Sequence, residues 1–143
     1  MLFRSTSNRS AVIRIPAYAK APELRRFELR NPDATCNPYF CYAAILMAGL
    51  DGVKNKIDPH ENGWGPYDMN LYHLPEEEKA KLKGLPTSLE EALDCLEKDY
   101  AYLTEGGVFP EELLRNFIKM KRAESRQMAA IPHPAEFDKY YNL

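Results

Sequence analysis

The segment from residue 25 to residue 39 joins two patterns that limit what this chain can fold into. In its first half, charged residues stand at every second position, at Arg26, Glu28 and Arg30, and apolar residues fill the places between them. Because successive side chains of a strand point to opposite faces, this alternation predicts a strand with one charged face and one face that packs in a core.

A helix is predicted directly after this strand. Residues 31–33, Asn-Pro-Asp, interrupt the alternation, and Asn37 then offers a helix N-cap with Pro38 at the first helical position, where its missing N–H costs nothing. From Pro38 to about Gly49 the residues are apolar or small on every side of a helical projection, so we expect a helix buried all round.

A second stretch with the same alternation lies upstream. Ala11, Ile13 and Ile15 fall on one side of an expected strand over residues 11–15, and Pro16 ends it. A lone pair of strands is marginally stable in water and leaves unpaired edges. We therefore expect both strands to belong to a sheet larger than this chain alone supplies.

The second half of the chain predicts mainly helices. Ser88 and Glu91 have the spacing of a capping box, and apolar residues at helical spacing follow them for several turns. The glycine pair at 106 and 107 is expected to end this helix, and Pro110 to begin another that runs toward Arg126. Two strands of antiparallel type, followed by a mainly helical region, predict the α+β class.

Two further segments lack a regular pattern. Residues 57–75 mix glycine, proline and polar residues, which indicates an exposed loop, and a short polar turn or helix is expected at residues 74–78. The C-terminal segment carries three aromatic residues, Phe137, Tyr140 and Tyr141, and is expected either to fold back or to dock on a partner.

The composition argues against some classes of function. The net charge is −2 and the isoelectric point is near 5.9, so we expect no basic surface for nucleic acid or an anionic membrane. The three cysteines have no metal-binding spacing, and no apolar stretch reaches the length of a membrane span. We expect reduced thiols, buried as small apolar residues, and a cytoplasmic location.

Charged residues along a strand face are most often a solvated surface with weak ion pairs, and that interpretation stays open on spacing alone. The order of the motifs resembles the last catalytic strand of type I glutamine synthetases: Arg-x-Glu-x-Arg, then Pro-Asp, then Asn-Pro-Tyr opening an alanine-rich helix. Further motifs match this family in order along nearly the whole chain, at residues 8–11, 13–16, 48–56, 70–72, 106–109 and 133–137.

The resemblance implies a role for each charged residue on these strands. Glutamine synthetases transfer the γ-phosphoryl group of ATP to the side-chain carboxylate of glutamate, and ammonia then displaces phosphate. Guanidinium groups bind phosphate oxygens through paired hydrogen bonds, and divalent metals need carboxylate oxygens. By resemblance, Arg9 and Arg30 would be catalytic: Arg9 would contact nucleotide phosphates and glutamate, and Arg30 would hold glutamate and the transferred phosphoryl group. Arg14 and Arg26 would hold ATP phosphates, and Glu28 would bind one of a pair of Mg²⁺ or Mn²⁺ ions.

Two features of the resemblance concern regulation and assembly. Tyr72 matches the tyrosine that is adenylylated in one branch of the family, although the next residues differ from that branch, so an ordinary loop tyrosine stays an open alternative. The segment around His133 matches a C-terminal tail that reaches a subunit of the opposing ring, which implies a homo-oligomer, a dodecamer of two hexameric rings.

The resemblance identifies residues 1–143 as the C-terminal part of a catalytic domain, with active-site strands in residues 1–36 and a helical region with an assembly tail in residues 37–143. In the family, most metal ligands and the ammonium site lie upstream of this part, so we expect the isolated chain to be inactive and to need the remainder of the enzyme. The implied function is ATP-dependent ligation of ammonia to L-glutamate through γ-glutamyl phosphate. A γ-glutamyl-amine ligase of the same family and a non-catalytic interaction module remain alternatives.

Overall fold

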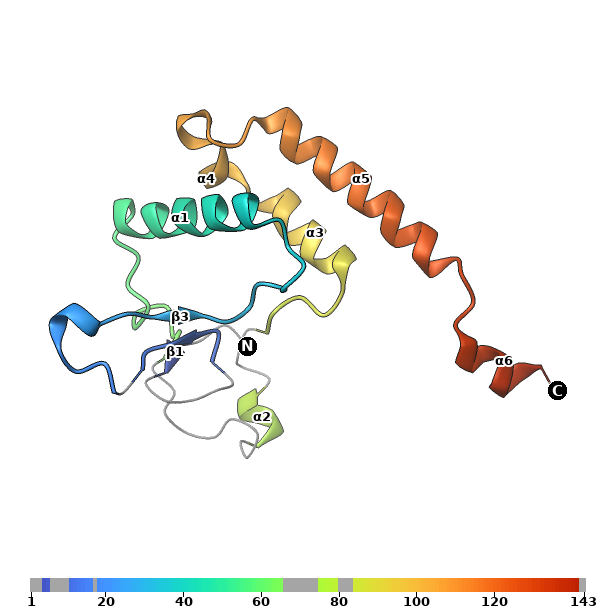
Figure 1. Cartoon of the computed structure of the whole chain (residues 1–143), viewed down its shortest axis with the longest axis horizontal. Helices are drawn as coiled ribbons and strands as arrows, with labels where there is room; N and C mark the ends of the chain where they lie inside the picture. Colours follow the sequence, from blue (N-terminus) through green and yellow to red (C-terminus); the bar gives the residue numbers. More distant parts are fainter. Residues whose placement is uncertain (1–3, 6–10, 17, 66–74, 80–83, 142–143) are drawn as a thin grey trace. The chain divides into compact units, whose positions relative to one another are not determined.

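The computed structural model describes residues 4–5, 11–16, 18–65, 75–79 and 84–141, and it combines a small sheet with several helices (Figure 1). The α+β class predicted from the sequence is therefore confirmed. The chain divides into two compact units, Met1–Leu85 and Pro86–Leu143, and each is described by itself below.

The first unit contains a sheet of three short strands in the order β1-β2-β3. β1 pairs with β2 in parallel, whereas β2 and β3 are antiparallel, with Ile13 opposite Leu29. The Arg30 N–H donates to the Val12 carbonyl at 2.8 Å and extends this pairing beyond the strand ends. The predicted antiparallel pair is confirmed, over shorter spans than the alternation indicated. The strands are β1 (Arg4–Ser5), β2 (Ile13–Arg14) and β3 (Glu28–Leu29), and a 3-10 turn, η1 (Pro22–Leu24), lies between the last two.

Some apolar residues of the strand region are buried, and others are exposed. Ala11, Val12 and Pro16 are buried. Phe27 is 66% exposed, so the expectation that its side of the strand packs in a core is wrong at this residue, and Ile15 is 41% exposed. Among the described residues no helix packs extensively on the strands, which leaves these two side chains without a covering layer.

Helix α1 (Pro38–Lys54) begins where the sequence predicts and ends later than Gly49. The Asn37 side chain accepts hydrogen bonds from the Tyr39 and Phe40 N–H groups, at 3.0 and 3.3 Å, which confirms the N-cap. The expected burial on all sides is wrong: Met47 is buried, whereas Tyr39 is 83% exposed. In the described part of the unit no other element packs extensively on α1, so most of its apolar surface stays uncovered.

The predicted loop after α1 is described as far as residue 65. It is built from turns, and its large side chain, Trp64, is 37% exposed. Residues 66–74 lie outside the described part of the chain. The short polar helix expected near residue 76 is present as α2 (Glu76–Lys79).

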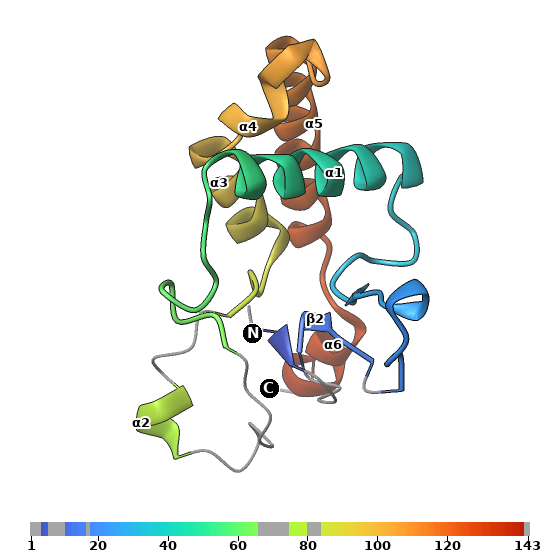
Figure 2. The same cartoon turned by 90° about the vertical axis from the view of Figure 1, so that its left-hand side faces the viewer.

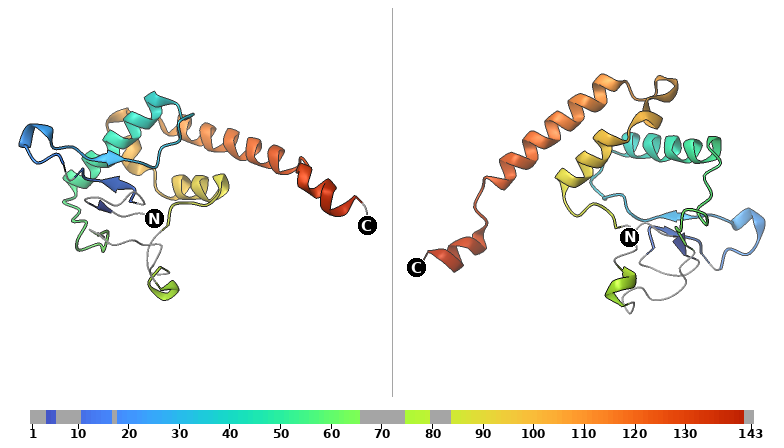
Figure 3. Two further views of the ribbon diagram at one scale, coloured as in Figure 1. Left: turned by 60° about the horizontal axis from the view of Figure 1, so that its bottom comes forward. Right: turned by 180° about the vertical axis from the view of Figure 1, so that it is seen from behind.

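The second unit is helical and has a core of its own. Helices α3 and α5 pack side by side, as Figures 1 and 3 show. Buried side chains come from both helices and from the connection between them: Leu93, Leu103, Phe109, Leu114 and Ile118. The elements are α3 (Leu89–Lys98), α4 (Ala101–Thr104), the 3-10 turn η3 (Glu105–Gly107), α5 (Glu111–Ala129) and α6 (Pro134–Tyr140).

The start of α3 forms half of the predicted capping box. Ser88 Oγ accepts from the Glu91 N–H at 3.1 Å. The Glu91 carboxylate, however, accepts from the backbone N–H and the hydroxyl of Thr87, at 2.7 and 2.9 Å, in place of the Ser88 N–H. These bonds hold the pKa of Glu91 below its usual range, the backbone bond being the larger cause.

The helix predicted from residue 89 toward the glycine pair is interrupted. Asp99 has φ −143° and ψ 72°, which ends α3, and the chain resumes as α4. Gly106 and Gly107 then have φ of +65° and +74°, a left-handed conformation that only glycine adopts without a steric cost, so they end the helical segment as predicted.

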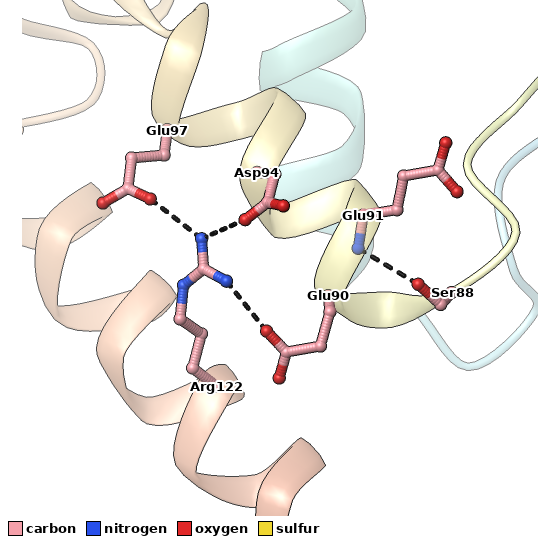
Figure 4. Close-up of polar contacts among 6 residues, drawn as sticks. All are labelled: Ser88, Glu90, Glu91, Asp94, Glu97 and Arg122. Atoms are coloured by element: carbon pink, nitrogen blue, oxygen red, sulfur yellow. Dashed lines mark hydrogen bonds and ion pairs between the residues drawn. The ribbon is translucent and has the colours of Figure 1, made fainter.

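A cluster of charged residues joins α3 to α5 (Figure 4). Arg122 Nη1 contacts Glu90 at 2.8 Å, and Nη2 contacts Asp94 at 2.6 Å and Glu97 at 2.8 Å. The Arg122 side chain is only 21% exposed, and hydrogen bonds to Asp94 and Glu97 raise its pKa. We call these four residues the Arg122 cluster.

Helix α6 lies beyond the end of α5 in Figure 3 and carries the C-terminal aromatic residues. His133 caps it, because its side chain accepts from the Ala135 N–H at 3.1 Å while Glu136 accepts from the His133 N–H at 3.2 Å. Phe137, Tyr140 and Tyr141 are all more than half exposed. Over the described ranges, no helix is long and apolar enough to cross a bilayer.

The cysteines are not core residues, contrary to expectation. Cys36 and Cys95 are exposed, and Cys41 is half-buried. Cys36 lies in the loop before α1 and Cys95 lies near the end of α3, where neighbouring segments leave both open to solvent.

Candidate functional site

The charged face predicted from the sequence is centred on a cross-strand pair in the first unit. Arg14 on β2 lies directly opposite Glu28 on β3. Directly opposed residues of an antiparallel pair project from the same face of the sheet. Arg14 Nη1 donates to Glu28 Oε2 at 3.0 Å, and the side chains are 25% and 31% exposed. The structure thus brings two of the predicted site residues together in a partly buried place.

Arg14 retains hydrogen-bonding capacity beyond this pair. Its Nε is buried and has no hydrogen-bond partner among the described residues. A buried donor without a partner costs free energy, and guanidinium groups bind carboxylate and phosphate oxygens through several N–H groups at once. Arg14 therefore has donor capacity left beyond its bond to Glu28, and its side chain, which is 25% exposed, can also donate to an anionic oxygen atom.

Arg30 follows on the same face. Its N–H bonds to the carbonyl of Val12, which continues the register that sets Arg14 opposite Glu28. Because Arg30 is two residues from Glu28 along an extended chain, the two belong to one face. The Arg30 side chain is exposed. The site therefore has one paired arginine and one solvent-facing arginine around a single carboxylate.

Arg26 lies before the strand and is engaged elsewhere. Its guanidinium donates to the Tyr18 hydroxyl and lies 5.3 Å from the centre of the Tyr18 ring. A cation over an aromatic face is attracted by the ring quadrupole. Sequence reasoning missed Tyr18, because a partner eight residues away across a turn leaves no periodic signal. Arg9 and Tyr72, the other predicted site residues, lie outside the described residues, so their roles stay predictions.

The connection from β3 to α1 is organised by local hydrogen bonds. Asp33 accepts from the backbone N–H and the hydroxyl of Thr35, at 2.7 and 2.6 Å. The hydroxyl bond and then the backbone bond lower the pKa of Asp33, so the turn is fixed around an ionised carboxylate. This loop sets the distance between the charged strand and the start of α1.

The described residues fit a metal ion only in part. Glu28 offers one carboxylate, and in the described ranges no three His, Cys, Asp or Glu side chains lie together as a possible metal-binding group. Mg²⁺ and Mn²⁺ favour oxygen ligands, which a glutamate supplies. Glu28 thus could supply one ligand, and a complete metal site would need further ligands besides these residues.

A separate groove of about 710 Å³ lies on the second unit, between α5 and the end of α3. Arg115, Lys119, Arg122 and Arg126 line it together with Glu97 and Tyr100. Arg122 is held by three carboxylates and Arg115 by Glu111 at 2.6 Å. Because Arg115 and Arg122 are already paired with carboxylates, the groove offers an anion fewer free positive charges than its four basic residues suggest.

Comparison with known proteins relates nearly the whole chain to one family of enzymes. The family model described as the catalytic domain of glutamine synthetase matches residues 1–140. Glutamine synthetase of Aquifex aeolicus is 51% identical over 139 residues, which are 97% of this chain and 29% of that protein. The Salmonella typhimurium protein of the same name is 49% identical over 143 residues, 100% of this chain and 29% of that protein. The chain therefore spans less than a third of the length of these relatives.

Proposed function

Because the chain belongs to the glutamine synthetase catalytic-domain family, we propose that it forms part of the active site of a glutamate–ammonia ligase. It corresponds to the C-terminal part of that domain. The observation that carries the proposal is the Arg14–Glu28 pair, which places a partly buried guanidinium with a free Nε beside a carboxylate.

The proposed reaction proceeds in two steps. The terminal phosphoryl group of ATP passes to the side-chain carboxylate of L-glutamate, which gives ADP and γ-glutamyl phosphate. Ammonia then attacks the acyl carbon and displaces phosphate, which leaves glutamine. Negative charge moves with the phosphoryl group, and fixed guanidinium groups stabilise such charge without rearranging.

The arginines divide this work by their positions. Arg14 would hold a phosphate oxygen through the exposed part of its guanidinium, while Nη1 keeps Glu28 oriented. Arg30, which is exposed on the same face, would hold the glutamate carboxylate and the phosphoryl group in transfer. Arg9 and Arg26 would contact the nucleotide, and Arg26 would do so from its contact with Tyr18.

Glu28 would supply one carboxylate oxygen to a divalent metal, Mg²⁺ or Mn²⁺. A metal bound there would neutralise phosphate charge and polarise the bond that breaks. Arg14 fixes the direction of the Glu28 carboxylate, because the pair is held across two strands at 3.0 Å. The pair would therefore act as one unit, with the carboxylate facing the metal and the guanidinium facing phosphate.

The remaining features concern the whole enzyme. We propose that the other metal ligands and the ammonium site come from the rest of the chain and from neighbouring subunits, that this chain alone is inactive, and that the enzyme assembles as a dodecamer in which the C-terminal segment contacts the opposite ring. Adenylylation of Tyr72 is proposed as a form of regulation, and intact-mass analysis after treatment with an adenylyltransferase would detect it.

The proposal is tested with a chimera in which this chain replaces the matching segment of the Salmonella typhimurium relative, which covers the whole chain at 49% identity. γ-Glutamyl hydroxamate formation from ATP, glutamate and hydroxylamine with Mn²⁺ is the assay. Activity in the chimera, lost in Glu28→Ala, is expected. A chimera that assembles to the parent's size and is inactive would contradict the proposal. Faster turnover with another amine than with ammonia would favour the γ-glutamyl-amine ligase alternative.

A further inference from the structure

Cys36 and Cys41 lie on either side of the N-cap of α1. Asn37 is the N-cap and Pro38 is the first helical residue, so Cys36 is the residue before the cap and Cys41 is the fourth helical residue. Side chains at these two positions pack against each other in the hydrophobic staple that accompanies many helix starts. Here both staple positions are occupied by thiols. Figure 2 shows the loop that leads from the strands into this end of α1.

The backbone around the two cysteines is fixed on both sides. The Cys36 N–H donates to the Asp33 carbonyl at 3.1 Å, and the Cys41 N–H donates to the Asn37 carbonyl at 3.0 Å. Asn37 itself caps the helix through two backbone N–H groups. These bonds hold the backbones of the two cysteines at a fixed separation across the first turn of α1.

The thiols also affect each other directly. Burial raises the pKa of the Cys41 thiol, and a hydrogen bond with Cys36 and the charge of that neighbour raise it further. Cys36 is exposed and Cys41 is half-buried. An oxidant in solution thus meets Cys36 first, and Cys41, whose thiolate is the less favoured of its two forms, lies beside it for a second step.

We propose that Cys36 and Cys41 are a reversible disulfide pair that closes the first turn of α1. With a small disulfide such as oxidised glutathione, the Cys36 thiolate attacks one sulfur, forms a mixed disulfide and releases the other half as a thiol. Cys41 then loses its proton to solvent, its sulfur attacks Cys36, and the second half leaves as a thiol. Two protein thiols are oxidised and one small disulfide is reduced to two thiols.

The bridge would stiffen the connection between the charged strand and α1. Residues 30–37 are the link between Glu28 on β3 and the helix, and Cys36 lies at the end of this link. The inference does not depend on the proposed ligase activity, because it concerns only the thiols and the first turn of α1. Cys95 lies in the other unit and is exposed, so it is replaced in the test to keep it from forming adducts of its own.

The test measures the equilibrium of this pair with reduced and oxidised glutathione in the 143-residue chain carrying Cys95→Ser. Intact mass distinguishes the internal disulfide, which loses two hydrogen atoms, from glutathione adducts. We expect the effective concentration of the two thiols to be at least about tenfold higher in buffer than in denaturing guanidinium, since the folded turn holds them together. Cys36→Ser and Cys41→Ser should each give only a glutathione adduct.

Equal effective concentrations in buffer and denaturant, or adducts as the main product in buffer, would overturn the proposal. The same measurement on the chimera, with the Cys36–Cys41 peptide mapped after proteolysis, covers the case in which the short chain does not form α1. The glutathione ratio is set to one that oxidises the short chain in denaturant. If the Cys36–Cys41 peptide from the folded chimera carries no disulfide at this ratio, the proposal is equally overturned.

Discussion

Arg14 and Arg122 are exposed to a similar extent but differ in how many carboxylates they bind. Their side chains are 25% and 21% exposed, and each is paired with carboxylates of a neighbouring element. Arg122 gives both terminal nitrogens to three carboxylates, whereas Arg14 gives one nitrogen to one carboxylate and keeps a buried Nε without a partner among the described residues. The Arg122 guanidinium ties two helices together through three carboxylates, whereas the Arg14 guanidinium has one such partner and keeps donors for a ligand.

The two units also differ in how well their apolar residues are buried. The second unit buries Leu93, Leu114 and Ile118 between α3 and α5. In the first unit, α1 leaves Tyr39 83% and Val53 78% exposed. The chain spans 29% of the length of its relatives, and we expect the remainder of a complete enzyme to cover this surface. Apolar surface and hydrogen-bonding capacity are thus both left over in the unit that carries the proposed site.

The largest expected effect is on turnover. Arg30→Ala in the chimera should lower turnover by roughly 10²- to 10³-fold, the usual cost of removing a donor that stabilises developing charge. The hydroxamate assay measures it, and Arg25→Ala, which removes an exposed arginine from the same segment, is the matched control. Near-normal turnover in Arg30→Ala would show that Arg30 is only a solvated surface residue without a role in the reaction.

The next effect concerns metal dependence. Glu28→Gln keeps the size of the side chain and removes its charge, so the Mg²⁺ or Mn²⁺ concentration for half-maximal activity should rise by at least about tenfold. Titration of the chimera with each metal provides the measurement, and Glu23→Gln serves as the control. An unchanged requirement would show that Glu28 is only the ion-pair partner of Arg14.

Arg122→Ala should act on stability and not on chemistry. Its removal leaves Glu90, Asp94 and Glu97 close together without their cation, and Glu90 already has one buried oxygen without a hydrogen bond. The midpoint of thermal unfolding, followed by circular dichroism, should fall by more than in Arg115→Ala, whose ion pair is 70% exposed on the arginine side. Equal midpoints would remove the basis for calling the cluster structural.

The smallest effect is a pH dependence at the start of α3. The pKa of Glu91 is lowered in the folded chain, chiefly by the Thr87 N–H, so its contribution to stability is present above its ordinary pKa and is lost as the pH falls through the lowered one. Glu91→Gln should therefore lower the thermal midpoint at pH 7, and the difference from the parent chain should vanish at acidic pH. A difference that persists below pH 2 would contradict this cause.

The sequence predicted where helices begin and end better than it predicted which side chains are buried. Asn37 and Pro38 set the start of α1, and Gly106 and Gly107 mark the end of the helical segment after α3, because each effect depends on neighbouring backbone atoms. The break at Asp99 was not predicted, since the apolar spacing continues across it into α4.

Contacts between distant residues could not be predicted from the sequence. The alternation around Glu28 placed it on a charged face, and antiparallel pairing then set it opposite Arg14. The partners of Arg122 lie 25 to 32 residues away on another helix, where no pattern in the sequence marks them. The exposure of Phe27 could not be predicted either, because burial depends on which elements cover a surface.

Binding of a non-hydrolysable ATP analogue with Mg²⁺ to the chimera, measured by calorimetry, tests the contrast between the two arginines most directly. Arg14→Ala should weaken binding roughly 10- to 100-fold, as expected for lost hydrogen bonds to a charged group, while Arg122→Ala should leave the affinity unchanged in the assembled enzyme. Unchanged affinity in Arg14→Ala, or an equal loss in both variants, would contradict the assignment of Arg14 to the active site.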